Sequence, residues 1–283
     1  MARTPTGGRV AWPFLLPATA WFTLLFLVPL AAITVVSFWS VANYQLVPGF
    51  GLAAWRRVFQ PTYLIVLLRT LRVAGLVTVV SALVGYPVAY YIARRLTRRR
   101  ALMLTLVALP LWTSYLVRSF AWLLILGTNG VANFVLMRTG LVATPLRWLL
   151  YSEFAVVVAL VHVYVPLFVL PVYAVLEKID PRLVEASRDL GASPARTFWT
   201  VLFPLSLRGV ATGCLFVFVP AAGSYVTPEL LGGTNAVMLG SLIAQQFGDV
   251  FQYPFGSALS LSLIIVLLAV SLLVLRLGRV GGA

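Results

Sequence analysis

DPRLVEASRDLGASPARTFWTVLFP, residues 180–204, is a charged segment inside an otherwise strongly apolar chain. Asp180 can cap a first helix that begins at Pro181, and Gly191 can end that helix. Ser193 and Pro194 can begin a second helix in the same way. The segment therefore predicts two short helices joined by an elbow, outside the apolar environment of the rest of the chain.

The first of these helices has two kinds of surface. Leu183, Ser187 and Leu190 share one face at helical spacing, whereas the charged residues lie largely on the other faces. This pattern is typical of an element that docks between an apolar and an aqueous surface.

The composition places the chain in a membrane. Apolar residues make up 61% and charged residues 10% of the sequence, against about 45–50% and about 25% in globular domains. A spanning helix needs roughly 20 apolar residues, and six segments qualify: 13–38, 73–93, 101–125, 154–176, 207–225 and 255–275. We predict an all-α polytopic membrane protein with one transmembrane domain over residues 1–283 and a loop at 177–206 between the fourth and fifth spans.

Lysine and arginine are distributed unequally across the membrane in this arrangement. The side that holds both termini and the 177–206 loop has twice as many of them as the other side. The positive-inside rule places that side in the cytoplasm. The net charge of +14 then follows from topology, because the arginines cluster after span ends and form no stripe for nucleic acid.

The chain lacks the residue patterns of common catalytic sites. The only lysine is Lys178, so no phosphate-binding loop with its lysine exists, and we expect no catalytic, cofactor or metal site. Cys214 has no partner cysteine for an intrachain disulfide, and His162 is expected to be a packed or hydrogen-bonded residue. No carboxylate lies in the middle of a span, which argues against an ion-coupled carrier.

The spacing within residues 185–204 carries a family resemblance. The pattern EAA, three residues, G, nine residues, I-x-L-P defines the EAA loop of ABC importer permeases. This chain resembles it with conservative differences at three positions, and the matching residues are Glu185, Ala186, Ser187, Gly191, Val201, Leu202, Phe203 and Pro204. Residues 110–136 and 218–233 look like the spermidine/putrescine-type branch of that family.

The resemblance implies a type I permease fold in the bacterial inner membrane. A second homologous permease, an ABC ATPase dimer that binds ATP and Mg²⁺, and an extracytoplasmic substrate-binding protein would be partners, with membrane lipid around the spans and no nucleic acid. The helix that opens at Pro181 would lie in a cleft of the ATPase, with Glu185 pairing with a basic group there. Gly191 would provide the turn, and Pro204 would mark the break between loop and span.

The resemblance leaves the substrate open. A polyamine is our leading prediction, but opine, thiamine and ferric-ion importers belong to the same branch. A polyamine cation would favour aromatic faces along its path, and Trp112 and Tyr115 are candidates that could equally be packing residues. Arg118 is either an interfacial anchor or structural pair, or a contact for cargo or binding protein. Glu229 either faces the binding protein or pore mouth, or lies on a short re-entrant helix capped through Thr227 and Pro228.

The sequence leaves two other functional classes as alternatives. An ion-gradient-coupled transporter or channel would work without an ATPase and would tolerate changes at Glu185 and Gly191. A membrane-embedded enzyme would need a polar cluster near one membrane face, and the sequence shows none.

Overall fold

In the computed structural model of the protein, residues 12–280 are described. Within that range, six helical segments are long and apolar enough to cross a membrane: Leu16–Val36, Pro61–Arg94, Tyr115–Arg138, Glu153–Leu176, Pro194–Ala222 and Tyr253–Arg276. The predicted helical, six-span class is confirmed. Arg3 and Arg9, the two basic residues that precede the first predicted span, lie outside the described residues.

The chain forms two compact units. The first combines the residues up to Gln60 with Gln245–Ser262. It contains α1 (Trp12–Val36), a hairpin of β1 (Ser40–Ala42) and β2 (Gln45–Val47), α2 (Ala53–Val58), the last residues of α12 (Leu239–Gly248) and the first part of α13 (Tyr253–Val280).

The hairpin is the one departure from the all-helical prediction among the described residues. β1 and β2 are antiparallel, with Ser40 opposite Val47 and Ala42 opposite Gln45. Asn43 and Tyr44 connect them with positive φ angles of 49° and 60°, which two-residue turns of this handedness require. Sequence periodicity cannot detect strands of three residues.

Aromatic contacts hold the first unit together. The rings of Phe38 and Phe50 stack with centroids 4.9 Å apart. Trp55 of α2 donates a hydrogen bond from Nε1 to the Ser37 hydroxyl over 3.3 Å. The Arg57 guanidinium lies 4.3 Å from the centroid of the Phe255 ring, so a cation–π contact joins α2 to the start of α13.

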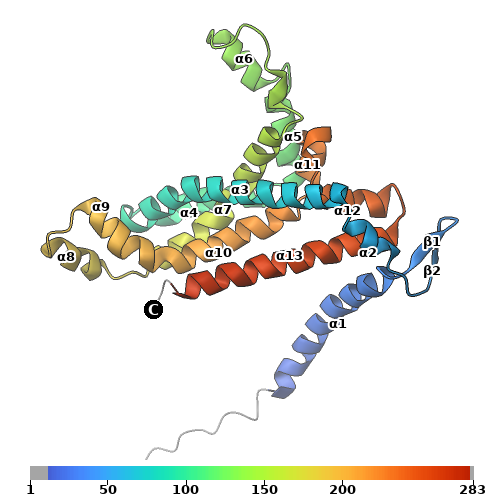
Figure 1. The fold of residues 1–283 in the computed structure, drawn as a ribbon. Helices are drawn as coiled ribbons and strands as arrows, with labels where there is room; N and C mark the ends of the chain where they lie inside the picture. Colours follow the sequence, from blue (N-terminus) through green and yellow to red (C-terminus); the bar gives the residue numbers. More distant parts are fainter. Residues whose placement is uncertain (1–11, 281–283) are drawn as a thin grey trace, which may run out of the picture. The chain divides into compact units, whose positions relative to one another are not determined.

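The second unit is built on three long helices, α3 (Pro61–Arg94), α7 (Glu153–Leu176) and α10 (Phe203–Ala222), which pack side by side (Figure 1). Phe168 of α7 is fully buried at their centre. A Cβ atom added at Gly85 of α3 would lie 2.7 Å from the Phe168 ring, and one at Gly213 of α10 would lie 2.9 Å from it. Two glycines thus make room for one aromatic side chain, in keeping with the small residues found at membrane helix interfaces.

Helices α3 and α7 run in the same direction. Near their beginnings Arg72 forms an ion pair with Glu153. At their ends the Arg94 Nη2 group donates a hydrogen bond over 3.0 Å to the Ile179 carbonyl, just after α7. Parallel second and fourth spans require that the chain between them return across the membrane once, as a six-span topology demands.

The helix that we expected over residues 101–125 is interrupted, and that prediction is wrong. The structure has α4 (Arg100–Ala108), a 3₁₀ turn η1 (Leu109–Trp112), and then α5 (Tyr115–Leu126) and α6 (Val131–Arg138). Thr113 is extended, with φ −87° and ψ 148°. Pro110 is the physical reason, because its ring offers no N–H and clashes with the preceding turn of an α-helix.

The remaining elements of the second unit are short. They are η2 (Arg147–Leu149), α8 (Pro181–Asp189), α9 (Pro194–Thr197), the π-turn η3 (Phe198–Leu202), α11 (Val226–Leu231) and η4 (Thr234–Ala236). The Leu239 amide at the start of α12 donates a hydrogen bond to the buried Thr70 hydroxyl of α3 over 2.8 Å. Helix α3 begins at Pro61, twelve residues before the predicted start at residue 73. The prediction began too late because Arg69 and Arg72, which belong to the helix, lower the hydropathy of its first part.

Candidate functional site

The segment 180–204 forms the predicted pair of helices. The Asp180 carboxylate accepts a hydrogen bond from the Arg182 amide over 2.9 Å and caps α8. The Ser193 hydroxyl accepts one from the Arg196 amide over 3.3 Å and caps α9. Both interactions satisfy amides that have no partner within their helices, so the sequence-based assignment of both caps is confirmed.

Gly191 makes the elbow between the two helices. Its φ angle is +80°, a conformation that residues with a Cβ atom adopt at a cost. Its amide donates to the Arg188 carbonyl over 2.8 Å, and the Ala192 amide donates to the Ser187 carbonyl over 3.1 Å. These two bonds close the end of α8 in the manner of a helix C-terminal glycine motif.

A further hydrogen bond locks the elbow. The hydroxyls of Ser187 on α8 and Thr197 on α9 are 3.1 Å apart, and Thr197 is 2% exposed. The two helices are therefore joined by side chains as well as by the turn. This gives the segment the character of one rigid element.

The faces of α8 differ from those predicted. Leu183 and Leu190 are exposed, at 47% and 89%, but Ser187 is turned inward to Thr197. Val184 packs against the core, and Glu185 lines a polar pocket beneath the helix. Leu183 and Leu190 thus leave apolar surface of the α8 segment uncovered by the described residues.

The boundary between this element and the fifth span is also not where we expected it. Pro204 does not break the helix: η3 runs directly into α10, which begins at Phe203. The irregularity precedes the proline, because Pro204 has no N–H for the Thr200 carbonyl and the chain widens into a π-turn over Phe198–Leu202. The helical backbone is therefore continuous from α9 through η3 into α10.

Aromatic rings attach this turn to α3. The Phe203 ring lies 5.9 Å from Tyr86 and 5.1 Å from Trp199, and Phe198 lies 5.8 Å from Tyr86. The Tyr86 hydroxyl is 2.9 Å from that of Ser206 on α10. Phe203, one of the residues that differ from the motif, thus has a packing role. Val201 is partly buried and Ala186 is exposed.

A second polar cluster lies between α5 and α11. The Tyr115 hydroxyl is 2.7 Å from the hydroxyl of Ser224 and 2.6 Å from that of Thr227. Ser119 shares a 3.0 Å hydrogen bond with Thr227. Tyr164 of α7 donates to the Pro220 carbonyl over 3.3 Å at the edge of the same cluster. These hydroxyls tie α5, α7, α10 and α11 together.

Removing the Tyr115 hydroxyl is expected to loosen this cluster. An interhelical hydrogen bond in a membrane protein contributes about 0.6 kcal/mol on average, so Tyr115→Phe, which loses two, should cost about 1 kcal/mol. This corresponds to a fall in melting temperature of about 2–4 °C for a protein of this size, measured in detergent. Tyr225→Phe, which alters an exposed tyrosine nearby, is the control and should leave the melting temperature unchanged; equal shifts would contradict the role of the cluster.

The other pathway candidates do not converge with Tyr115. Trp112 is 78% exposed at the end of η1, and Glu229 is exposed on α11. Thr227 does not cap α11, which begins after Tyr225 without a side-chain cap, because its hydroxyl is engaged with Tyr115. Arg118 is partly buried, and its Nε and Nη1 atoms have no hydrogen-bond partner within the described residues.

Sequence reasoning missed Ser119 and Ser224, and it gave Thr227 the role of a helix cap instead of a place in this cluster. The available signal was a set of hydroxyl residues inside or beside apolar spans, with Ser119 four residues after Tyr115, hence on the same helix face. His162 accepts a 3.1 Å hydrogen bond from Trp122 Nε1, so the expectation of a hydrogen-bonded residue is confirmed.

Comparison with known proteins agrees with this architecture. Residues 85–280 match the family described as binding-protein-dependent transport system inner membrane component. The fold resembles a bacterial alginate ABC transporter solved in complex with an alginate pentasaccharide-bound periplasmic protein, with a TM-score of 0.72, 18% identity and coverage of 96% of this chain and 95% of that one.

Two curated relatives are spermidine/putrescine transport system permease proteins named PotB. The protein from Haemophilus influenzae is 35% identical over 250 residues, which cover 88% of this chain and 87% of that protein. The one from Escherichia coli K12 is 36% identical over 248 residues, which cover 87% and 90%. The chain belongs to the family of inner-membrane permease components of binding-protein-dependent ABC transport systems.

Proposed function

We propose that this chain is a polyamine-importing permease of the bacterial inner membrane, with both termini in the cytoplasm and its spans forming one transmembrane domain. A second homologous permease completes the translocation path, and an extracytoplasmic binding protein delivers the cargo. An ABC ATPase dimer, which binds ATP and Mg²⁺, docks on α8. This chain itself binds no cofactor or metal in the proposed cycle.

The rigid elbow at Gly191 supports the coupling role. Leu183 and Leu190 present exposed apolar surface on α8, and the Ser187–Thr197 hydrogen bond keeps α8 and α9 in one arrangement. From α9 the helical backbone continues through η3 into α10. Closure of the ATPase on ATP would move this element as a lever and change the tilt of α10 between inward-open and outward-open states.

The relatives named for spermidine and putrescine support a polyamine as cargo. Binding a multiply charged cation calls for carboxylates and aromatic faces. Glu229, Trp112 and Tyr115 are the candidates here, and Arg118 remains a candidate contact for the binding protein. Glu153 is already paired with Arg72, so the binding protein and the second permease would supply most of the charge selection.

Uptake into proteoliposomes tests this function. The complete transporter, reconstituted with its binding protein outside and ATP inside, should accumulate radiolabelled spermidine or putrescine. Accumulation should stop with a non-hydrolysable ATP analogue and should persist when ion gradients are collapsed. Uptake that follows an ion gradient without ATP would refute the ATP-driven mechanism, whereas ATP-driven uptake of another solute would refute only the cargo.

Protease protection tests the orientation. Epitope tags at either terminus should survive extracellular protease in intact spheroplasts and should be cleaved after the membrane is permeabilised. A tag inserted at Gly140, between α6 and η2, should be cleaved in intact spheroplasts. Cleavage of a terminal tag before permeabilisation would overturn the proposed topology.

A further inference from the structure

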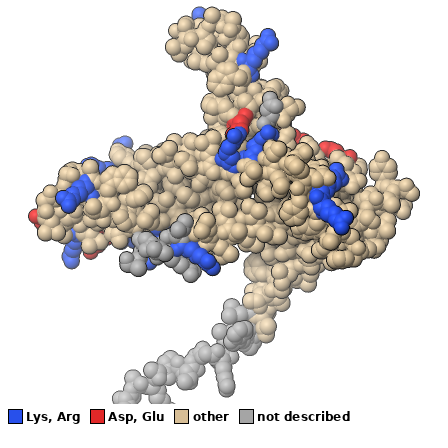
Figure 2. All heavy atoms as spheres, viewed as in Figure 1, with Lys and Arg blue, Asp and Glu red and all other residues tan. Residues whose placement is uncertain are grey.

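A polar pocket of about 430 Å³ lies between the end of α3, the start of α4 and one face of α8. Ligand pockets commonly measure roughly 300–1,000 Å³. Figure 2 shows basic side chains over the end of the molecule that α8 and α9 form. The charged residues that line the pocket are Arg94, Arg95, Arg100, Arg188, Glu177 and Glu185.

The pocket carries an excess of positive charge. Of its four arginines, only Arg100 has a carboxylate within ion-pair distance among the described residues, and this is Glu177 at 2.7 Å. The Arg94 and Arg100 guanidiniums are fixed by hydrogen bonds to the Ile179 and Ala93 carbonyls, each 3.0 Å long. Their Nε atoms are buried and have no hydrogen-bond partner within the described chain. Guanidinium groups held at the wall of a pocket, with more arginines than carboxylates around them, favour a phosphate-bearing anion.

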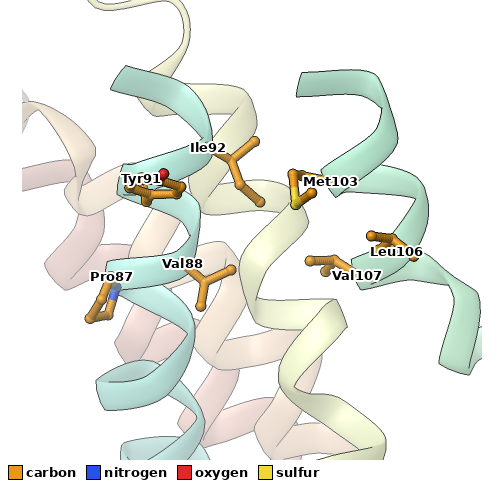
Figure 3. A pocket seen from close by; sticks show the side chains of 7 residues that line it. All are labelled: Pro87, Val88, Tyr91, Ile92, Met103, Leu106 and Val107. Carbon is orange, nitrogen blue, oxygen red and sulfur yellow. The ribbon is translucent and has the colours of Figure 1, made fainter. Parts of the chain in front are cut away.

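An apolar groove of about 440 Å³ is lined by residues of α3 and α4 that neighbour the pocket arginines in sequence. It lies between α3 and α4, where Ile92 and Met103 face each other across it (Figure 3). Tyr91 and Ile92 are within one helical turn of Arg94 and Arg95, and Met103 is one turn beyond Arg100. The full lining is Pro87, Val88, Tyr91, Ile92, Met103, Leu106 and Val107.

The groove continues away from the arginines. Val88, Leu106 and Val107 also line a second apolar pocket, which extends along α7 from Val169 to Val158. A soluble phosphate has no hydrocarbon chain to bury in such a groove, and a neutral lipid has no negative charge to pair with the arginines. The two features together suit a molecule with an anionic phosphate at one end and a hydrocarbon chain at the other.

We propose that an anionic phospholipid binds here, with its phosphate among the arginines and an acyl chain in the groove between α3 and α4. Arg188 belongs to α8, so the bound headgroup bridges the coupling helix to α3 and α4. The lipid would then restrain the element that the ATPase moves. Lipid binding depends on neither the cargo nor the energy source, whereas the restraint on α8 rests on the proposed coupling function.

A pair of double variants tests the headgroup contact. Arg95→Gln/Arg188→Gln removes two arginines that line the pocket. The control, Arg98→Gln/Arg182→Gln, removes two arginines that do not line it, one from the same α3–α4 connection and one from α8. Each basic residue near a membrane surface contributes about fivefold to the affinity for anionic lipid, so the loss of two pocket arginines should weaken binding about 30-fold. The control double should retain binding.

Binding is measured on the complete transporter with photoactivatable phosphatidylglycerol, and the labelled residues are mapped by mass spectrometry. Labelling at residues 87–107 that is lost in the pocket double supports the proposal. Competition by inorganic phosphate at concentrations that displace the lipid would assign the pocket to a soluble anion. Equal loss of lipid labelling in both double variants would overturn the proposal. So would a pocket double that loses the ATPase but keeps the lipid.

A second pair of variants tests the groove. Leu106, which is 50% exposed, lines the groove, and Leu106→Trp would fill it. Leu102, also on α4 and 54% exposed, does not line the groove, so Leu102→Trp is the control. We expect Leu106→Trp to reduce labelling several-fold and Leu102→Trp to leave it unchanged. Labelling that survives Leu106→Trp would show that the lipid lies elsewhere, and crosslinks from Leu106 to a second permease would assign the groove to a protein interface.

Discussion

Replacing Gly191 by valine is expected to reduce ATP-driven uptake at least tenfold while leaving the protein in the membrane. The φ angle of +80° at this position strains a β-branched residue by about 1–3 kcal/mol. The chain can relieve that strain by opening the elbow, which would misplace α8 against its partner. Uptake in proteoliposomes and the yield of membrane-inserted protein are the two measurements.

Two variants separate the elbow from strain in general. Gly140 also has a positive φ, +71°, and neither glycine has an atom within 4 Å of an added Cβ. Gly140→Val therefore imposes similar backbone strain at a position distant in sequence from α8, and this variant should retain wild-type uptake. Gly191→Asn should retain more uptake than Gly191→Val, because asparagine tolerates this conformation. Normal uptake by Gly191→Val would contradict the lever model.

Replacing Gly213 by valine is expected to have the largest effect on folding. A Cβ atom there would lie 2.9 Å from the Phe168 ring and 3.0 Å from the Phe168 carbonyl oxygen. Overpacking a core costs about 1–3 kcal/mol and occasionally more. We expect the upper end here, because a backbone atom cannot move aside. The variant should lose most of its detergent-stable, monodisperse protein, measured by size-exclusion chromatography.

The matched control lies in α3. A Cβ atom at Gly75 meets nothing within 4 Å, so Gly75→Val should remain monodisperse. The three atoms nearest to a Cβ added at Gly85 are side-chain atoms of Phe168 and Val169, so Phe168→Leu should rescue Gly85→Ala in part. The same second change should not rescue Gly213→Val. Rescue of both variants would show that the helix backbones are farther apart than described here.

The sequence predicted the parts of this protein that local interactions determine. Asp180, Gly191 and Ser193 were assigned correctly because a cap or a helix end depends on residues within one turn. The apolar spans were recognised for a similar reason, since roughly 20 consecutive residues carry the signal.

The parts that were missed depend on distant segments. The cluster around Tyr115 joins residues more than 100 positions apart, and no local pattern shows such a contact. The break after Pro110 was not predicted, and the irregularity expected at Pro204 lies in the π-turn before it, because a proline indicates that a helix must adjust but not where. The inward turn of Ser187 depends on Thr197, which only the folded elbow brings near.

The exposed leucines of α8 provide the most direct test of the central claim, that this helix docks the ATPase. The tagged transporter is purified in mild detergent, and the ATPase recovered per permease is quantified for wild type and for Leu183→Asp/Leu190→Asp. Leu141→Asp, at an exposed leucine outside α8, is the control. We predict that the double variant loses most of the ATPase but keeps the second permease, and that the control keeps both. Full recovery of the ATPase with the double variant would contradict the account.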